Sequence, residues 1–204
     1  MIDASEALAR LREGNRRFVA GQPTPPLSSV ERRALAADQA PFAIILGCSD
    51  SRVPAELVFD QGFGDLFVIR VAGNIVAPSQ VGSVEFAASK FGTKLVVVVG
   101  HSGCGAITAA VEELLDGATT ESRNLRSIVD RVRPSVAAVI GGRRDVDRKT
   151  LIRESVIANV RASVDHLRHG SELLEELIRQ EGLAIVGAKY SLDTGVVSFF
   201  DAGA

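Results

Sequence analysis

The chain has 204 residues and a formal net charge of −2, with 46% apolar and 24% charged residues. This length suffices for one domain with a substantial core, and the composition is ordinary for a soluble globular protein. The near-neutral charge gives no reason to expect a nucleic-acid or anionic-membrane partner. The longest apolar run, residues 95–99, is far too short to cross a membrane, and the first residues do not resemble a secretory signal. We therefore expect a cytoplasmic protein.

Apolar periodicity predicts strands that alternate with helices along the chain. In chain order, we expect helices over residues 5–19 and 29–37, strands over 42–47 and 66–71, a helix over 81–91, a strand over 95–99, helices over 106–115, 151–167 and 171–180, a strand over 183–188 and an edge strand over 196–200. Ser5 and Ser171 are expected to cap their helices. We expect Pro134 and the glycines at 141 and 142 to break a polar, partly helical segment.

This alternation predicts an α/β fold. We expect a mainly parallel central sheet of four strands with an antiparallel edge strand, and helices on both faces, because parallel strands need right-handed crossover connections. No internal repeat and no composition shift divides the sequence, so a single domain over residues 1–204 is expected.

Two short motifs follow predicted strands and contain both cysteines of the chain. Cys-Ser-Asp-Ser-Arg occupies residues 48–52, and His-Ser-Gly-Cys-Gly occupies residues 101–105. Ligands in open α/β sheets gather at the carboxyl ends of strands, so the two motifs converge if their strands are neighbours. Two thiols, an imidazole and a carboxylate suit one zinc ion better than magnesium or calcium. The candidate metal ligands are Cys48, Asp50, His101 and Cys104.

Asp50 is also placed to pair with Arg52, two residues further on, in a contact whose geometry allows two parallel hydrogen bonds. That pairing predicts a switch: Asp50 on the metal closes the site, whereas Asp50 on Arg52 opens a fourth position for water. Gly103 and Gly105 allow a tight turn into the next helix, whose first N–H groups favour an anion. Gly105 is therefore a candidate for holding an anionic product.

Less specific interpretations of the same residues remain open at this stage. A closed site with all four ligands is compatible with a purely structural zinc ion, although structural sites more often use three or four cysteines and rarely a carboxylate. Cys48 and Cys104 are also compatible with unrelated buried thiols or with a redox pair.

The two motifs, about fifty residues apart, resemble those of the β-class carbonic anhydrases. The likeness extends over almost the whole chain. Residues 11–18 resemble the family's N-terminal helix, residues 67–76 its second strand and following loop, and residues 190–197 its C-terminal hairpin.

The resemblance implies reversible hydration of carbon dioxide to bicarbonate and a proton, by attack of a zinc-bound hydroxide on CO₂. Cys48, His101 and Cys104 match the zinc ligands, one ion per subunit, and Asp50 and Arg52 match the pair that gates the fourth position and orients the hydroxide. Family members are dimers or assemblies of dimers such as tetramers. The resemblance thus makes residues 1–40 a helical arm that packs on a partner subunit.

Further substrate contacts and two departures follow from the same resemblance. Gln39 matches a glutamine that contacts substrate across the dimer interface, and Phe86 stands where some plant-type members have a tyrosine near the substrate. Some members hold a regulatory bicarbonate with a tryptophan, an arginine and a tyrosine. Arg70 and Tyr190 match two of these, but Ile45 occupies the tryptophan position.

Two other functions fit the same motifs. Related sequences hydrolyse carbonyl sulfide or carbon disulfide, which offer the same linear electrophile as CO₂. A non-catalytic, zinc-stabilised interaction protein is the third hypothesis. Arg52 argues against it, because a structural site does not need a partner for its carboxylate.

Overall fold

The computed structural model describes residues 2–25, 28–117, 122–143 and 145–200, and its centre is a five-stranded sheet in the order β2-β1-β3-β4-β5. The strands are β1 (Ala43–Gly47), β2 (Leu66–Arg70), β3 (Leu95–His101), β4 (Ala184–Tyr190) and β5 (Val197–Phe200). The first four are parallel and β5 pairs antiparallel with β4. The predicted sheet is therefore confirmed, including its antiparallel edge strand.

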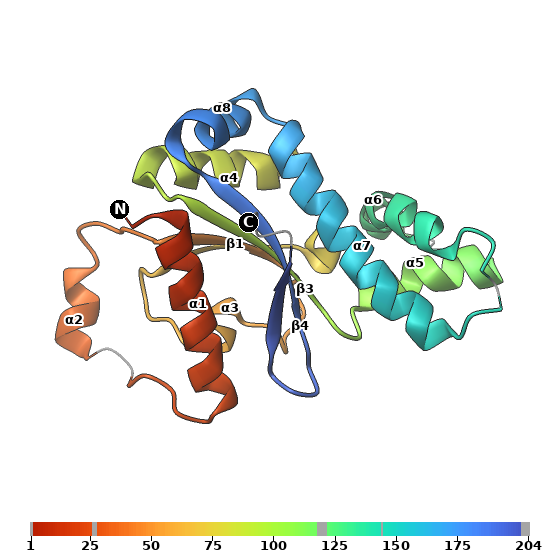
Figure 1. The fold of residues 1–204 in the computed structure, drawn as a ribbon, viewed down its shortest axis with the longest axis horizontal. Coiled ribbons are helices and arrows are strands. Elements are labelled where there is room, and N and C mark those ends of the chain that lie inside the picture. Colours follow the sequence, from red (N-terminus) through yellow and green to blue (C-terminus); the bar gives the residue numbers. More distant parts are fainter. Residues whose placement is uncertain (1, 26–27, 118–121, 144, 201–204) are drawn as a thin grey trace.

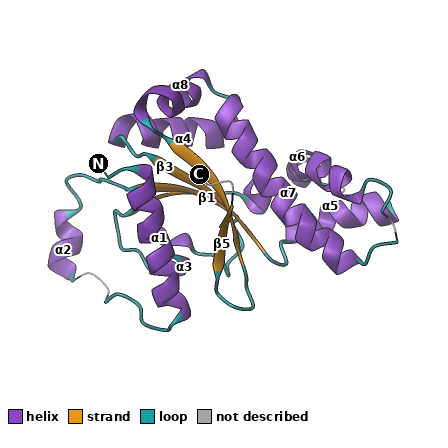
Figure 2. Cartoon of the chain, viewed as in Figure 1, coloured by secondary structure: helices purple, strands orange, loops and turns teal. Residues whose placement is uncertain are grey.

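Helices cover both faces of this sheet (Figures 1 and 2). Alternate side chains of the strands define the two faces, since successive residues of a strand point in opposite directions. Ile45 and Val97 lie in the cluster with α1 (Ala4–Val19) and α3 (Ala55–Val58). Ile44, Val96 and their neighbours pack against α4 (Pro78–Phe91), α7 (Arg148–His169) and α8 (Glu172–Glu181). Strands buried on both faces explain the continuous apolar runs in the sequence.

A third apolar cluster lies beyond the carboxyl ends of the strands. It is built by α5 (Gly105–Asp116), α6 (Arg123–Ile140) and α7, which pack together on one side of the sheet (Figure 1). Cys48 and Cys104 belong to this cluster. The helices therefore cover the edge of the sheet where the two motifs were expected to meet.

The structure corrects two local expectations. Asp3, not Ser5, caps α1, because its carboxylate accepts the Glu6 N–H at 2.8 Å. Pro134 does not break the polar segment but lies inside α6, whose burial of a valine stripe outweighs the lost hydrogen bond. Gly141 does end that helix, in the left-handed conformation, as expected. The segment was expected over residues 119–148, and its residues 119–121 and 144 lie outside the described residues.

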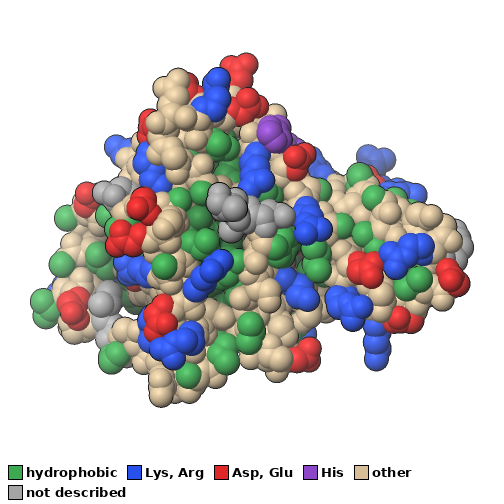
Figure 3. Space-filling model, in the orientation of Figure 1, with side chains coloured by type: hydrophobic (Ala, Val, Ile, Leu, Met, Phe, Trp, Pro, Cys, Tyr) green, Lys and Arg blue, Asp and Glu red, His purple; other side chains and the backbone are tan. Residues whose placement is uncertain are grey.

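Three short elements, α2 (Ser29–Ala34), α3 and the 3₁₀ turn η1 (Ala72–Asn74), complete the secondary structure of the described residues. α2 begins with a capping box between Ser28 and Glu31. The sequence did not predict α3 or η1. No helix within the described ranges is long and apolar enough to span a membrane. On the face shown in Figure 3, acidic and basic side chains are interspersed.

Candidate metal centre

The two motifs meet because β1 and β3 are neighbours in the sheet. Gly47, the last residue of β1, is in register with Val99, so Cys48 follows one strand beside the end of the other. His101 ends β3, and Cys104 is the N-cap of α5. One ligand atom from each of Cys48, His101 and Cys104 lies within 4.8 Å of the others. The expected convergence of these three side chains is thus observed.

All three side chains are buried, with exposures of 5% for Cys48, 0% for His101 and 1% for Cys104. His101 Nδ1 lies 3.0 Å from the carbonyl oxygen of Ser102, to which it can donate its proton. His101 Nε2 is buried and has no hydrogen-bond partner among the described residues. A buried nitrogen without a partner is costly. The Ser102 contact therefore leaves Nε2 as a lone-pair donor facing the two sulfurs.

The sulfurs of Cys48 and Cys104 lie within 4.8 Å of each other, and each affects the pKa of the other. The neighbouring Cys104 thiol and two backbone N–H groups lower the pKa of Cys48, against the opposing effect of burial. The same contact, together with burial, raises the pKa of Cys104. No disulfide joins them. A cation bound between the two sulfurs would favour the thiolate form of both.

A backbone N–H from one segment and an arginine side chain from another hold Cys48 and its backbone. The N–H of Gly73, in η1, donates to Cys48 Sγ at 3.3 Å. Arg70, the last residue of β2, donates from Nε to the Cys48 carbonyl at 3.0 Å and from Nη2 to the Asp50 carbonyl at 2.7 Å. These contacts fix both the sulfur and the backbone that carries it.

Asp50 and Arg52 form a bidentate pair at the side of the cluster. Arg52 donates from Nε to Asp50 Oδ1 at 2.9 Å and from Nη2 to Oδ2 at 2.7 Å, and its backbone N–H also reaches Oδ1 at 3.0 Å. The side-chain contact with Arg52 holds the pKa of Asp50 well below its usual range, so the carboxylate stays ionised. Asp50 Oδ2 lies 4.0 Å from His101 Nε2. Asp50 is thus adjacent to the three-residue cluster, but it is paired with Arg52.

The donor set tests which metal these residues fit. Two sulfurs and one imidazole nitrogen are soft or borderline ligands that favour zinc over the hard, oxygen-binding cations. The buried His101 Nε2, which has no hydrogen-bond partner among the described residues, is a group that a cation would satisfy. The residues therefore fit a metal ion with three protein ligands.

Two of the three predicted substrate contacts, Gln39 and Phe86, are not gathered around this cluster within one chain. Phe86 is 53% exposed and packs with Phe67 and Phe91. Because Phe67 is in register with Ile44, this group lies towards the amino end of the sheet, away from Cys48. Gln39 is exposed, and its N–H bonds the preceding carboxylate.

Gly105 is the first residue of α5 and lies next to the candidate ligand Cys104. The following N–H groups, of Ala106 and Ile107, act on Cys104 and lower its pKa, against the larger effects that raise it. The helix start therefore points at least partly at the sulfur of Cys104. The role of Gly105 in holding a product stays a prediction.

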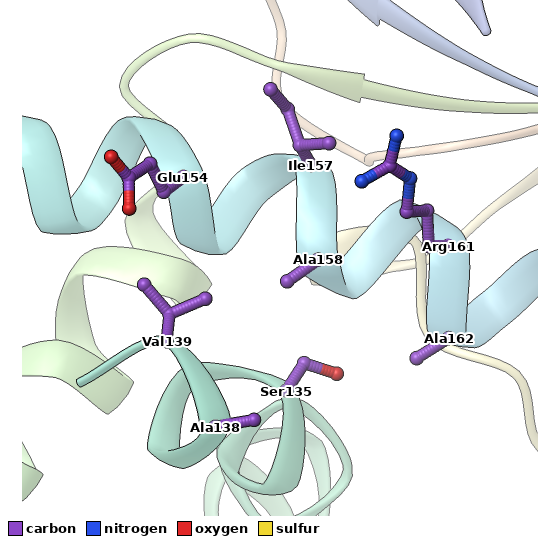
Figure 4. Close-up of a pocket in the computed structure, with 8 residues that line it drawn as sticks. All are labelled: Ser135, Ala138, Val139, Glu154, Ile157, Ala158, Arg161 and Ala162. Carbon is purple, nitrogen blue, oxygen red and sulfur yellow. The ribbon is translucent and has the colours of Figure 1, made fainter. Parts of the chain in front are cut away.

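Pockets large enough for a ligand lie elsewhere. One of about 570 Å³ separates α6 from α7, where Ala138 and Val139 face Ala158 and Ala162 (Figure 4). A second, of about 400 Å³, lies beside the start of α4. None of the residues lining either pocket is a cysteine or belongs to the two motifs. The candidate site is therefore the buried cluster of Cys48, His101 and Cys104, and not one of these cavities.

Comparison with known proteins agrees with the geometry. The family model described as carbonic anhydrase matches residues 43–197, a range that contains both motifs. The chain belongs to the β-class carbonic anhydrase family. It is 45% identical to carbonic anhydrase 2 of Mycobacterium tuberculosis over 186 residues, which cover 91% of this chain and 87% of that protein. A carbonic anhydrase of Mycolicibacterium smegmatis is 40% identical, covering 92% of this chain and 88% of the relative.

Solved structures of this carbonic anhydrase family share the fold. The β-carbonic anhydrase CcaA matches with a TM-score of 0.77 and 25% identity, covering 95% of both chains. One of two tetrameric β-carbonic anhydrases from Sordaria macrospora matches with a TM-score of 0.76 and 25% identity, covering 85% of this chain and 87% of that chain.

Sequence reasoning missed some residues that hold the candidate metal centre together. Arg70 was assigned only to a bicarbonate pocket, yet it binds the backbone of the first motif. Gly73 was not singled out, although a glycine between an alanine and an asparagine after a strand indicates a turn. Nothing in the sequence indicated which sulfur its N–H would reach.

Proposed function

We propose that this protein catalyses the reversible hydration of carbon dioxide to bicarbonate and a proton. The observation that carries the proposal is the buried Cys48, His101 and Cys104 cluster with the Asp50–Arg52 pair beside it. Its carbonic anhydrase relatives, at 45% and 40% identity over most of the chain, support the same reaction.

The cofactor in this proposal is one Zn²⁺ ion per subunit, held by Cys48 Sγ, His101 Nε2 and Cys104 Sγ. Zinc with three protein ligands acts as a Lewis acid that lets water react as a nucleophile near neutral pH. Two thiolates and a neutral imidazole balance its charge. The protein supplies a dry, buried position for this chemistry.

Asp50 is the group that orients the attacking water. Its Oδ1 already accepts two hydrogen bonds from Arg52, whereas Oδ2 accepts one and faces the cluster. Oδ2 thus has a lone pair left to accept a proton donor. Because the pKa of Asp50 is held low, this carboxylate orients water but does not store the proton that the reaction releases. Arg52 fixes the acceptor through its fork of donors.

A partner subunit completes the substrate site in this proposal. Gln39 and Phe86 are exposed in the single chain and are not gathered at its own metal centre. An assembly of dimers, with residues 1–40 packed on the partner, would bring such residues to the neighbouring centre. A cytoplasmic location remains our expectation from the sequence, since two cysteines kept as thiols suit a reducing compartment.

Stopped-flow measurement of CO₂ hydration by the zinc-loaded protein tests the proposal. We expect a rate well above that of buffer at neutral to mildly alkaline pH. No rate above buffer would refute the function, and a rate on carbonyl sulfide that exceeds the rate on CO₂ would reassign it to the hydrolase. If zinc removal unfolds the chain and the loaded protein acts on neither substrate, the metal is structural.

A further inference from the structure

Helix α7 presents a buried polar stripe to the turn η1. Ser155, Asn159 and Ser163 are spaced by four residues, so they lie on one face of the helix, and none is more than 5% exposed. Polar groups at such depth are costly unless they make hydrogen bonds. Two of the three bond carbonyl groups of η1, far away in the sequence.

Asn159 makes the contact that reaches the metal centre. Its Nδ2–H donates to the carbonyl oxygen of Gly73 at 2.9 Å, and the N–H of that same Gly73 donates to Cys48 Sγ at 3.3 Å. Asn159 and Cys48 are thus connected through a single residue. One turn further along α7, Ser163 Oγ–H donates to the Asn74 carbonyl at 3.1 Å.

The turn has little freedom to reach the sulfur in another way. Gly73 has a φ of +69°, and a Cβ placed there would lie 3.0 Å from Ala106 Cβ and 3.3 Å from Val132 Cγ2. It is therefore enclosed by α5 and α6 as well as by α7. Asn159 bonds the peptide group that follows Gly73, whereas the N–H that reaches Cys48 belongs to the peptide group before it. The φ and ψ of Gly73 couple the two groups, so the Asn159 contact favours the conformation in which the Gly73 N–H points at Cys48.

We propose that Asn159 is a positioning residue of the metal centre, which holds the Gly73 N–H on the sulfur of Cys48. This proposal rests on the proposed function only in taking Cys48 as a metal ligand. A donor on the sulfur withdraws electron density and fixes the direction of the ligand, as outer contacts of metal ligands generally do. Removing such contacts typically weakens metal affinity about 10- to 100-fold.

The full-length protein loaded with NMR-active cadmium in place of zinc provides a direct readout. In the wild type, we expect scalar coupling between the metal and the Gly73 amide proton, transmitted through Cys48 Sγ. Asn159→Ala should lose this coupling and weaken zinc affinity, measured by competition with a chelator, about 10- to 100-fold. Asn159→Leu, which keeps the side-chain volume but has no donor, should behave in the same way if alanine impairs folding.

Two variants of the same helix are the controls. Val164→Ala removes buried apolar volume from α7 without touching η1. It therefore controls for a general loss of stability in this helix. Ser155→Ala removes a buried hydroxyl that has no hydrogen-bond partner among the described residues. Both should keep the coupling and the zinc affinity of the wild type.

The outcomes separate the two proposals. Retained coupling in the Asn159 variants, absent coupling in the wild type, or equal loss of affinity in Val164→Ala would each overturn the role of Asn159. A wild type that binds zinc and shows the coupling but does not hydrate CO₂ would refute the proposed function alone. Failure of Cys48→Ser to change zinc binding would refute both.

Discussion

The carboxyl edge of the sheet and the N-terminal segment with α2 are stabilised in different ways. At the edge, His101 and Cys104 are at most 1% exposed, and hydrogen bonds from β2 and η1 hold the first motif. In contrast, α2 has no buried residue, and its Val30 is 66% exposed. The carboxyl edge is thus buried and hydrogen-bonded within one chain, whereas the apolar side chains of α2 stay exposed in the single chain.

This difference indicates two levels of organisation. The candidate ligands depend only on the fold of the single chain, so metal binding should survive in an isolated subunit. Residues near α2, including Gln39, depend on whatever packs against this segment. Activity and metal binding should therefore be separable by mutation.

The largest effect is expected for Cys48→Ser at the carboxyl edge. Serine is a poor zinc ligand at neutral pH, so the variant should lose both bound zinc and CO₂ hydration. Metal content and the hydration rate measure this. Ser49→Ala, at the neighbouring exposed position, is the control and should match the wild type. A Cys48→Ser protein with full zinc content would exclude Cys48 as a ligand.

Arg52→Ala should reduce activity without releasing the metal. Without its fork of donors, Asp50 is free to move onto the cation or away from it, and kcat should fall about 100-fold, as when a preorganised polar contact is removed. Arg16→Ala is a matched control, since Arg16 forms the same two-bond contact with Glu13 on the exposed side of α1. Unchanged kcat in Arg52→Ala would contradict a role for the pair.

Val30→Glu tests the N-terminal segment. The side chain is exposed, so the free energy of unfolding of the single chain should change little. A charge in an interface between subunits should nevertheless yield a smaller assembly in sedimentation experiments, with zinc still bound. Leu173→Glu, at an exposed position of α8, is the control. An assembly unchanged by Val30→Glu would remove α2 from the interface.

Asp60→Asn should have the smallest effect, on stability alone. Burial raises the pKa of Asp60, but hydrogen bonds from Arg17 and Thr24 lower it by more, so the net pKa lies below its usual value. Loss of these charge-assisted contacts should cost about 2 kcal/mol. Asparagine tolerates the positive φ of 46° at this position, so backbone strain should not contribute.

The sign of the pH dependence follows from the lowered pKa of Asp60. Its stabilisation is fully present above the unfolded-state pKa and is lost as the pH falls through the folded-state value. Urea unfolding at several pH values should therefore show the stability gap between wild type and Asp60→Asn narrowing below about pH 4. A gap that stays constant on acidification would show that the charge of Asp60 is not responsible.

Much of the fold could be predicted because burial leaves a clear pattern. Four consecutive valines and three further apolar runs became the parallel strands, and Gly117 and Gly141 end helices as their conformational freedom suggests. Helix starts were less certain, since Asp3 and Ser5 are both good caps and only the folded chain distinguishes them. Pro134 was misjudged because its local cost is smaller than the burial gained by α6.

The sequence by itself determined what covalent spacing controls. His101 and Cys104 are separated by one tight turn, and Asp50 and Arg52 by one residue, so each pair can act together in any fold that keeps the local backbone. Tertiary structure decided what depends on packing. The order of the strands brings Cys48 to His101, and α7 places Asn159 against Gly73, 86 residues away in the chain. Such long-range contacts arise from the burial of whole faces, which no local pattern encodes.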